Sequence, residues 1–139
     1  MEQTRVYLDT SVYLAVLLGE KVPKIIVNLI QKSVLCSSTL ILIETERNLI
    51  RLTRERLLTS KEYAILRERL TLDQEAFILR DLTPDLCLTA DFPAVKTPRS
   101  SDLAHLRTAK WFLINGGLSK FLTLDHHQLA AAREMHLPV

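Results

Sequence analysis

The sequence predicts an α/β fold in which helices flank a central, mainly parallel β-sheet. Short, continuous apolar segments alternate with longer segments whose apolar residues repeat on a helical period. Continuous apolar strands are typical of parallel sheets, because the helical connections cover both faces. The chain has 139 residues, of which 47% are hydrophobic and 24% charged, as expected for a packed fold with one core. We therefore expect a single domain over residues 1–139.

In the amino-terminal half, two short strands are expected, each followed by two helices. Asp9 follows the first apolar segment and suits a helix start, and Gly19 suits a helix end. Thr59 and Glu62 have the spacing of a capping box, so a further helix should begin there. The expected strands are 6–8 and a segment within 33–38, and the expected helices end at Leu18, span 25–30 and 39–52, and follow Thr59.

The carboxyl-terminal half predicts a loop, a long helix, a third strand and a final helix. Residues 92–98 contain two prolines and are interpreted as the loop. Ser100 or Ser101 is expected to cap the helix, which should reach about Asn115 and end at Gly116. The third strand is expected at 121–124 and the final helix at 128–135.

Composition and short patterns exclude several classes of protein. The formal net charge is only +2, so nucleic-acid binding would depend on a local basic patch. Cys36 and Cys87 lie in apolar surroundings without a CxxC spacing, and we expect reduced core thiols in a cytoplasmic protein. The longest apolar run, 12–18, is shorter than the roughly 20 residues of a membrane-spanning helix. With three glycines, the chain cannot assemble a nucleotide-binding glycine loop.

Acidic residues follow each of the predicted strands. Asp9 follows the first strand, Glu44 lies in the helix after the second, and Asp125 follows the third. The carboxyl ends of parallel strands share one edge of the sheet, so these side chains should lie together, and Asp102 could join them. Clustered carboxylates repel one another unless a cation such as Mg²⁺ or Mn²⁺ binds between them. Hydrolysis of phosphodiester bonds with one or two metal ions is the chemistry of such a site.

The three aspartates also have a purely structural interpretation. Asp9, Asp102 and Asp125 each suit a helix N-cap or the first turn of a helix. Taken singly, each is better explained as a cap.

Glu44 differs, because it follows an apolar run inside a helix, where a buried carboxylate needs a partner. It could instead be a surface residue paired with Arg47 or Asn48. Glu46 is its competitor for the acidic site, and two residues of helix rotate it by roughly 200°. The periodicity does not choose between the two glutamates.

Four segments occur in order over nearly the whole chain: 6–11 (VYLDTS), 37–47 (SSTLILIETER), 101–109 (SDLAHLRTA) and 122–125 (LTLD). In this order and at these spacings they resemble the PIN domain, and in particular the VapC-type toxins of bacterial and archaeal toxin–antitoxin systems. The resemblance implies that four acids bind Mg²⁺ or Mn²⁺ and catalyse hydrolysis, and its Glu-x-x-Arg spacing selects Glu44 over Glu46. The four acids are Asp9, Glu44, Asp102 and Asp125, and the implied supporting hydroxyls are those of Ser11 and Thr123.

The same resemblance implies a metal-dependent endoribonuclease that acts as the toxin of a type II toxin–antitoxin system. It further implies an RNA substrate, a small antitoxin that inserts a segment near the acidic pocket, and a homodimer. The alternative is a catalytically degenerate PIN-fold module that binds a protein partner.

The chain departs from the family's pattern after its last aspartate. Many members carry a further acid there, whereas His126 and His127 follow Asp125. A one-metal site, or a second metal held mainly by the substrate, would fit this departure. The run Asp-His-His is also the signature of another metal phosphoesterase family, but that family needs further acidic motifs that we do not find here.

Basic residues offer candidate contacts to RNA phosphates. Arg47, Arg51 and Arg54 recur at helical spacing on the helix that carries Glu44. They are predicted either to guide the RNA backbone or to form an ordinary solvated face. Lys96, Arg99 and Lys120 are further candidates for such contacts, each better explained as a surface residue. His105 lacks the spacing of a zinc ligand.

Overall fold

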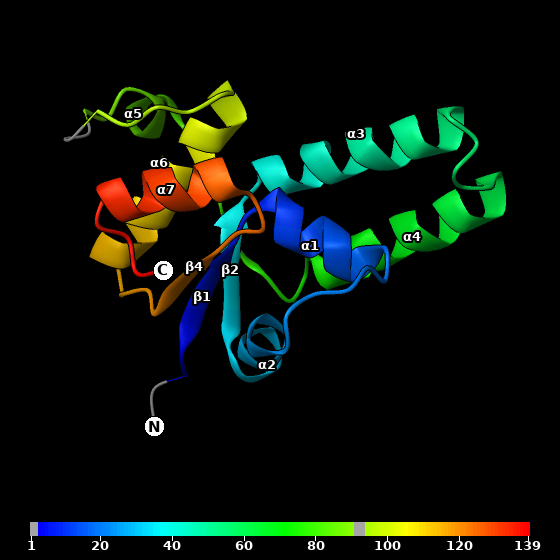
Figure 1. Cartoon of the computed structure of the whole chain (residues 1–139), viewed down its shortest axis with the longest axis horizontal. Coiled ribbons are helices and arrows are strands. Elements are labelled where there is room, and N and C mark those ends of the chain that lie inside the picture. The colour runs from blue at the N-terminus through cyan, green and yellow to red at the C-terminus, as the bar shows by residue number, and fades with distance from the viewer. Residues whose placement is uncertain (1–2, 91–93) are drawn as a thin grey trace.

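A four-stranded sheet with all strands parallel lies at the centre of the computed structural model, which describes residues 3–90 and 94–139 (Figure 1). The strand order is β3-β2-β1-β4. The strands are β1 (Arg5–Leu8), β2 (Val34–Ser38), β3 (Ile78–Arg80) and β4 (Lys120–Leu122). The helices in the described part of the chain are α1 (Thr10–Leu17), α2 (Lys24–Lys32), α3 (Leu40–Arg54), α4 (Ser60–Asp73), α5 (Pro84–Cys87), α6 (Ser100–Ile114) and α7 (His126–Glu134). The predicted α/β class is confirmed.

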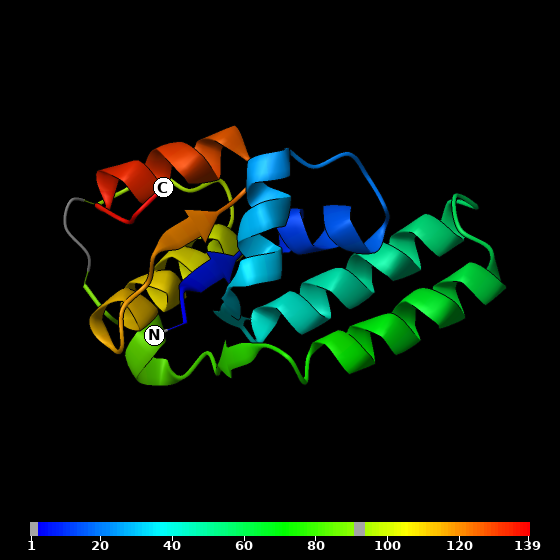
Figure 2. The same cartoon turned by 90° about the horizontal axis from the view of Figure 1, so that it is seen from below.

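Different helices cover the two faces of the sheet. Tyr7 and Phe121 belong to a buried cluster with apolar residues of α6 and α7. Val6, Leu8 and Leu122 form another cluster with Val12 of α1, against which α2 packs. In Figure 1, α6 and α7 lie to the upper left of the strands and α1 and α2 to the right, and in Figure 2 α1 and α2 again lie to the right of β1 and β4. Because both faces are covered, the strands are apolar on both sides, as parallel strands usually are.

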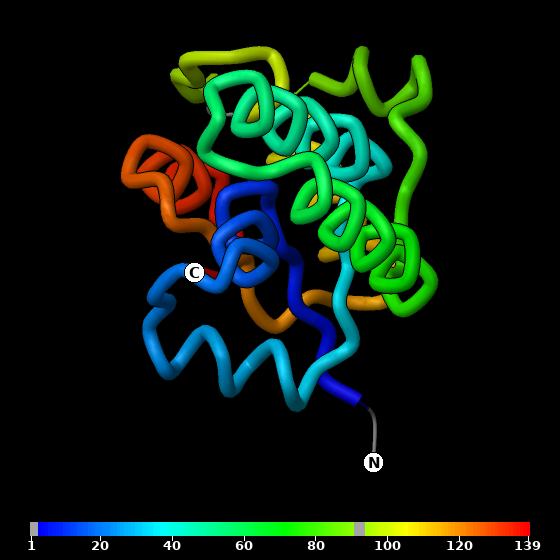
Figure 3. The backbone as a smooth tube through the Cα atoms, turned by 90° about the vertical axis from the view of Figure 1, so that its right-hand side faces the viewer, coloured from blue at the N-terminus to red at the C-terminus, as the bar shows by residue number. Residues whose placement is uncertain are grey.

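The helices α3 and α4 form a hairpin that extends away from the sheet (Figure 1). In Figure 3 this hairpin points toward the viewer. Its base is held by a cluster of Tyr13, Ile41 and Leu70. At the start of α4, the Thr59 hydroxyl accepts from the Glu62 N–H at 3.1 Å and the Glu62 carboxylate accepts from the Thr59 N–H at 3.0 Å. The predicted capping box is therefore confirmed.

Several local predictions differ from the structure. The third predicted strand is shifted, because β4 runs from Lys120 to Leu122. Arg99, and neither of the two serines after it, is the N-cap of α6, and it makes no side-chain capping bond. The short elements β3 and α5 were not predicted. Residues 94–99 form no helix or strand, as expected for the loop, whereas residues 92 and 93 lie outside the described part of the chain.

The two thiols are both free, but their environments differ from the prediction. Cys36 is buried in β2, whereas Cys87 at the end of α5 is exposed. The prediction of a second core thiol was therefore wrong. The side chain packed into the protein from the short α5 helix is Leu86. Among the described residues, none of the helices combines the length and apolar character needed to cross a membrane.

Candidate active site

The predicted acids lie beyond the carboxyl ends of the strands. Asp9 immediately follows β1 and is the N-cap of α1, where it accepts from the Val12 N–H at 3.3 Å. Asp125 is the N-cap of α7 and accepts from the N–H groups of His127 and Gln128, the second and third residues of the helix. Asp102 lies in the first turn of α6. The capping interpretation therefore describes Asp9 and Asp125 correctly, without removing either from the shared edge of the sheet.

Asp9 is buried, with 5% of its surface exposed. Ser11 donates a hydrogen bond to its Oδ1 at 2.6 Å, and Thr123 donates to its Oδ2 at 2.5 Å. Burial raises the pKa of Asp9, while the two hydroxyls and the nearby His105 act in the opposite direction. Thr123 Oγ1 also accepts from the Asp125 N–H at 3.1 Å, so the same hydroxyl links two of the acids. The structure thus places both expected hydroxyls on Asp9.

Glu44 projects from α3 toward α1 and α6. Its Oε1 accepts from the Thr10 hydroxyl at 2.8 Å and lies 2.6 Å from His105 Nε2. Partial burial disfavours the charged form, but the hydrogen bonds of His105 and Thr10 hold the pKa of Glu44 below its usual range. Glu46, in contrast, contacts α4, where it accepts from Tyr63 at 2.5 Å and pairs with Arg67 at 2.8 Å.

The contacts that His105 makes at this site were not predicted from the sequence. Its ring is buried, and Nδ1 lies 2.7 Å from the hydroxyl of Tyr7, which is also buried. With Glu44 ionised, the hydrogen-bond network assigns the ring proton to Nε2, so that Nδ1 accepts from Tyr7. Burial raises the pKa of Tyr7, and the phenol therefore keeps the proton that it donates. One signal was available: His105 follows Asp102 by three residues, which places the two on neighbouring positions of one helix face.

Arg99 is exposed, as interpreted from the sequence, and its guanidinium also contacts two of the acids. Nε donates to Asp102 Oδ2 at 3.3 Å and Nη2 donates to Asp102 Oδ1 at 3.1 Å. The same Nη2 lies 3.9 Å from Asp125 Oδ2. The hydrogen bonds that Arg99 donates to Asp102 raise the pKa of Arg99, and the charges of Asp102, Asp125 and Glu44 add to this effect. Arg99 therefore connects two of the predicted acids.

Within residues 3–90 and 94–139, no three or more His, Cys, Asp or Glu side chains form a group that could hold a metal ion. Protein donors instead occupy the carboxylates: hydroxyls hold Asp9, a hydroxyl and an imidazole hold Glu44, and a guanidinium holds Asp102. The side-chain atoms that could bind a cation here are carboxylate and hydroxyl oxygens, which are suitable ligands for Mg²⁺ or Mn²⁺. The position of Arg99 also shows that this edge accommodates a positive charge.

The predicted basic stripe lies along the exposed side of α3, which leads away from the acids. Arg51 pairs with Glu55 at 3.0 Å. Arg47 and Arg54 are exposed. Arg54 follows Glu44 by ten residues, which corresponds to about 15 Å along the helix axis. The structure therefore does not bring the far end of the stripe to the acidic edge.

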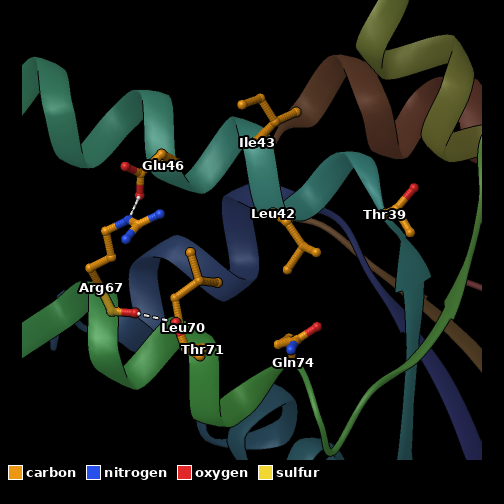
Figure 4. Close-up of a pocket in the computed structure, with 8 residues that line it drawn as sticks. All are labelled: Thr39, Leu42, Ile43, Glu46, Arg67, Leu70, Thr71 and Gln74. Carbon is orange, nitrogen blue, oxygen red and sulfur yellow. Dashed lines mark hydrogen bonds and ion pairs between the residues drawn. The ribbon is translucent and has the colours of Figure 1, made fainter.

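Two cavities differ in their relation to the acids. One of about 400 Å³ lies between α3 and α4, where Leu42 points toward α4 and Ile43 points away (Figure 4). None of the four predicted acids lines it. The other, of about 460 Å³, is bounded by α7 and the segment before α6. It is lined by Lys96, Pro98, His127, Ala130, Ala131 and Glu134, and therefore lies beside Asp125 and Arg99 in the chain.

A comparison with known proteins identifies the family. No curated protein matches the chain. The family model of the PIN domain matches residues 6–135, from β1 to the C-cap of α7. PIN domains share a nuclease fold and are typically metal-dependent nucleases. The match includes all four acids at the carboxyl edge of the sheet, and the chain belongs to the PIN domain family.

Proposed function

We propose that this PIN domain is a metal-dependent endoribonuclease that hydrolyses RNA phosphodiester bonds in the cytoplasm. We further propose that it is a VapC-type toxin of a type II toxin–antitoxin system. The observation that carries the nuclease proposal is the acidic edge, where Asp9 and Glu44 are each fixed by side-chain hydrogen bonds and Arg99 lies on Asp102 and Asp125. A surface of this charge suits a cation and a phosphate better than an apolar ligand.

The acids Asp9, Glu44, Asp102 and Asp125 would hold Mg²⁺ or Mn²⁺. A divalent cation bound there supplies Lewis-acid stabilisation of the phosphate and lowers the pKa of water. The surrounding residues hold the acidic side chains in position. Ser11 and Thr123 hold both oxygens of Asp9, and His105 with Thr10 keeps Glu44 ionised and in place. Contacts of this kind reduce the rearrangement needed when the cation and substrate bind.

The remaining partners follow from family resemblance. Arg47, Arg51 and Arg54 would bind the RNA backbone beyond the acidic edge, as phosphate contacts do in other nucleic-acid-binding proteins. A small antitoxin would bind near the acidic pocket, and the toxin would form homodimers.

The test of the nuclease proposal is cleavage of labelled single-stranded RNA and DNA in Mg²⁺, Mn²⁺ or chelator. We expect RNA cleavage that requires the cation and falls at least about 100-fold in Glu44→Gln, Asp9→Asn and Asp102→Asn. Glu46→Gln is the matched control, because it makes the same chemical change two residues away, where the side chain pairs with Arg67. Circular dichroism establishes that each variant is folded.

Two outcomes would contradict the proposal. Full activity in folded Glu44→Gln and Asp102→Asn would show that these acids are not catalytic. Absence of both cleavage and cation binding in the wild-type protein would favour the degenerate interaction module.

The toxin assignment has a separate test. Expression of the toxin alone should arrest growth, and co-expression with the product of a neighbouring gene should relieve that arrest.

A further inference from the structure

The guanidinium of Arg99 covers the carboxylate of Asp102. Both Asp102 oxygens accept hydrogen bonds from it, at 3.1 and 3.3 Å. The Asp102 side chain is 9% exposed and the Arg99 side chain 66% exposed. The arginine therefore lies on the solvent side of a buried carboxylate, and Asp102 cannot give an oxygen to a metal ion without loosening at least one of these bonds.

The backbone of Arg99 is held by hydrogen bonds at the start of α6, whereas its side chain is mostly exposed to solvent. Its carbonyl oxygen accepts from the N–H of Asp102 at 3.1 Å and of Leu103 at 3.4 Å, which anchors the residue at the start of α6. Movement of the guanidinium into solvent would break the contacts to Asp102 and Asp125 without breaking these helix bonds. Because the guanidinium itself is mostly exposed, water can replace its hydrogen bonds when it leaves the carboxylate.

The guanidinium of Arg99 balances the negative charge of two neighbouring carboxylates. Asp102 and Asp125 both lie within 4 Å of the same Arg99 nitrogen, at 3.1 and 3.9 Å. Without a cation, two carboxylates so close to one point would repel each other. The guanidinium removes that repulsion in the metal-free protein. A divalent ion at the same carboxylates would make the guanidinium redundant and would repel it.

We propose that Arg99 is a resident cation that competes with the catalytic metal, so that metal binding must displace its side chain from Asp102 and Asp125. This inference rests on the proposed function, because it assumes that these carboxylates bind a divalent ion. It gives Arg99 a regulatory role: it stabilises the metal-free protein and raises the metal concentration that the enzyme needs.

The experiment measures Mn²⁺ binding, from the loss of the free-ion paramagnetic resonance signal, in wild type, Arg99→Ala, Arg99→Lys and Lys96→Ala. We expect Arg99→Ala to bind Mn²⁺ about two- to fivefold more tightly than wild type, because the metal must break an ion pair whose arginine is open to solvent and whose strength is therefore modest. Arg99→Lys should fall between them, because a lysine keeps the charge but loses the two-pronged contact. Lys96→Ala removes the same charge from the same segment, and its affinity should equal that of wild type.

Thermal unfolding provides a second readout. In chelator, Arg99→Ala should unfold at a lower temperature than wild type, because its carboxylates are left uncompensated. In saturating Mn²⁺ the gap should close, so the variant gains more from the metal than wild type does. A residue that only stabilised the start of α6 would lower the unfolding temperature equally in both conditions.

The outcomes separate the two proposals. If wild type and Arg99→Ala bind Mn²⁺ with equal affinity, or if the variant binds more weakly, competition by Arg99 is wrong and the metal-dependent nuclease stands. If Lys96→Ala tightens binding as much as Arg99→Ala, the effect is one of net charge and the inference is again overturned. If neither wild type nor any variant binds Mn²⁺, the proposed metal-dependent function is wrong and the inference fails with it.

Discussion

The imidazole of His105 joins three elements at the candidate site. It contacts Tyr7 of β1, Thr10 of α1 and Glu44 of α3, at 2.7, 3.2 and 2.6 Å. Because the ring is buried, the buried hydroxyls of Tyr7 and Thr10 would lose a hydrogen bond without gaining water if the imidazole were removed. His105 therefore couples the position of a candidate catalytic carboxylate to the centre of the sheet.

This coupling predicts the effect of Tyr7→Phe. The change removes the hydroxyl that donates to His105 but keeps the ring, which stacks on Phe121 with centroids 5.4 Å apart. We expect a loss of about 1–2 kcal/mol in the free energy of unfolding, measured with urea, because a buried acceptor is left unsatisfied.

Tyr63→Phe is the matched control. Tyr63 also donates from its hydroxyl to a side chain, Glu46, but at the surface of the α3–α4 hairpin, where water can replace it. We expect Tyr63→Phe to lower the free energy of unfolding by no more than about 0.5 kcal/mol. Equal losses in the two variants would show that burial of the Tyr7–His105 bond adds nothing to stability.

At the level of elements, the starts of α4 and α6 show how far local sequence signals hold. Residues typical of N-caps lie near the start of both helices. Thr59 makes both bonds of a capping box, whereas Ser100 is already inside α6 and the cap position belongs to Arg99. A local pattern identified the box because its two partners lie three residues apart. It misplaced the start of α6 because the residues typical of caps, Ser100 and Ser101, are the first two residues of the helix itself.

The two helix starts predict different costs for the same substitution. Thr59→Ala should lower the free energy of unfolding by about 1 kcal/mol, since the hydroxyl that accepts from the Glu62 N–H at the start of α4 is lost. Ser100→Ala should change it by less than about 0.5 kcal/mol, because alanine is a better helix former than serine at an exposed position. Urea unfolding of both variants checks this, and a cost at Ser100 as large as that at Thr59 would show that the serine is the effective cap.

The helix α3 permits a prediction about RNA binding that does not depend on cleavage. If Arg47 and Arg54 contact phosphates, replacing both with alanine should reduce the slope of log affinity against log salt by about 1.4, from roughly 0.7 per contact on a single strand. Binding is measured by fluorescence anisotropy in chelator over a range of salt concentrations. Lys61→Ala, at the start of the neighbouring helix, removes a comparable charge and should leave the slope unchanged. An unaltered slope in the double variant would assign the stripe to solvent.

At the level of the whole molecule, topology was more predictable than individual contacts. Apolar strands separated by helices were sufficient to predict a parallel sheet and a shared edge for Asp9 and Asp125. The edge strand β3 was missed because it has only three residues and none is fully buried. The contact of His105 with Glu44 was missed for a different reason: it spans 61 positions, and no spacing within a helix specifies a partner that far away. The fold follows from periodic patterns, whereas the detailed site depends on how the elements pack.

The same packing predicts how the whole molecule responds to alkaline pH. Tyr7 lies between the sheet and α6, and Tyr13 lies between α1 and the α3–α4 hairpin. Burial raises the pKa of both phenols, and for Tyr13 the hydrogen bond to Asp73 and its charge act in the same direction. Near pH 10 the unfolded chain therefore loses phenolic protons that the folded protein keeps. The unfolded state then binds fewer protons, so the free energy of unfolding falls as pH rises.

The expected fall between pH 10 and 11 is about 1 kcal/mol for each of these tyrosines. Urea unfolding of wild type and Tyr13→Phe at pH 8, 10 and 11 measures it. The variant starts from lower stability because it lacks the 2.9 Å bond to Asp73, but its decline should be shallower by about 1 kcal/mol. Lysines and the other tyrosines titrate equally in both proteins, so they cancel in the comparison of slopes. Parallel declines would mean that Tyr13 ionises as readily in the folded protein as in the unfolded chain, and that the base of the hairpin opens to solvent before the sheet unfolds.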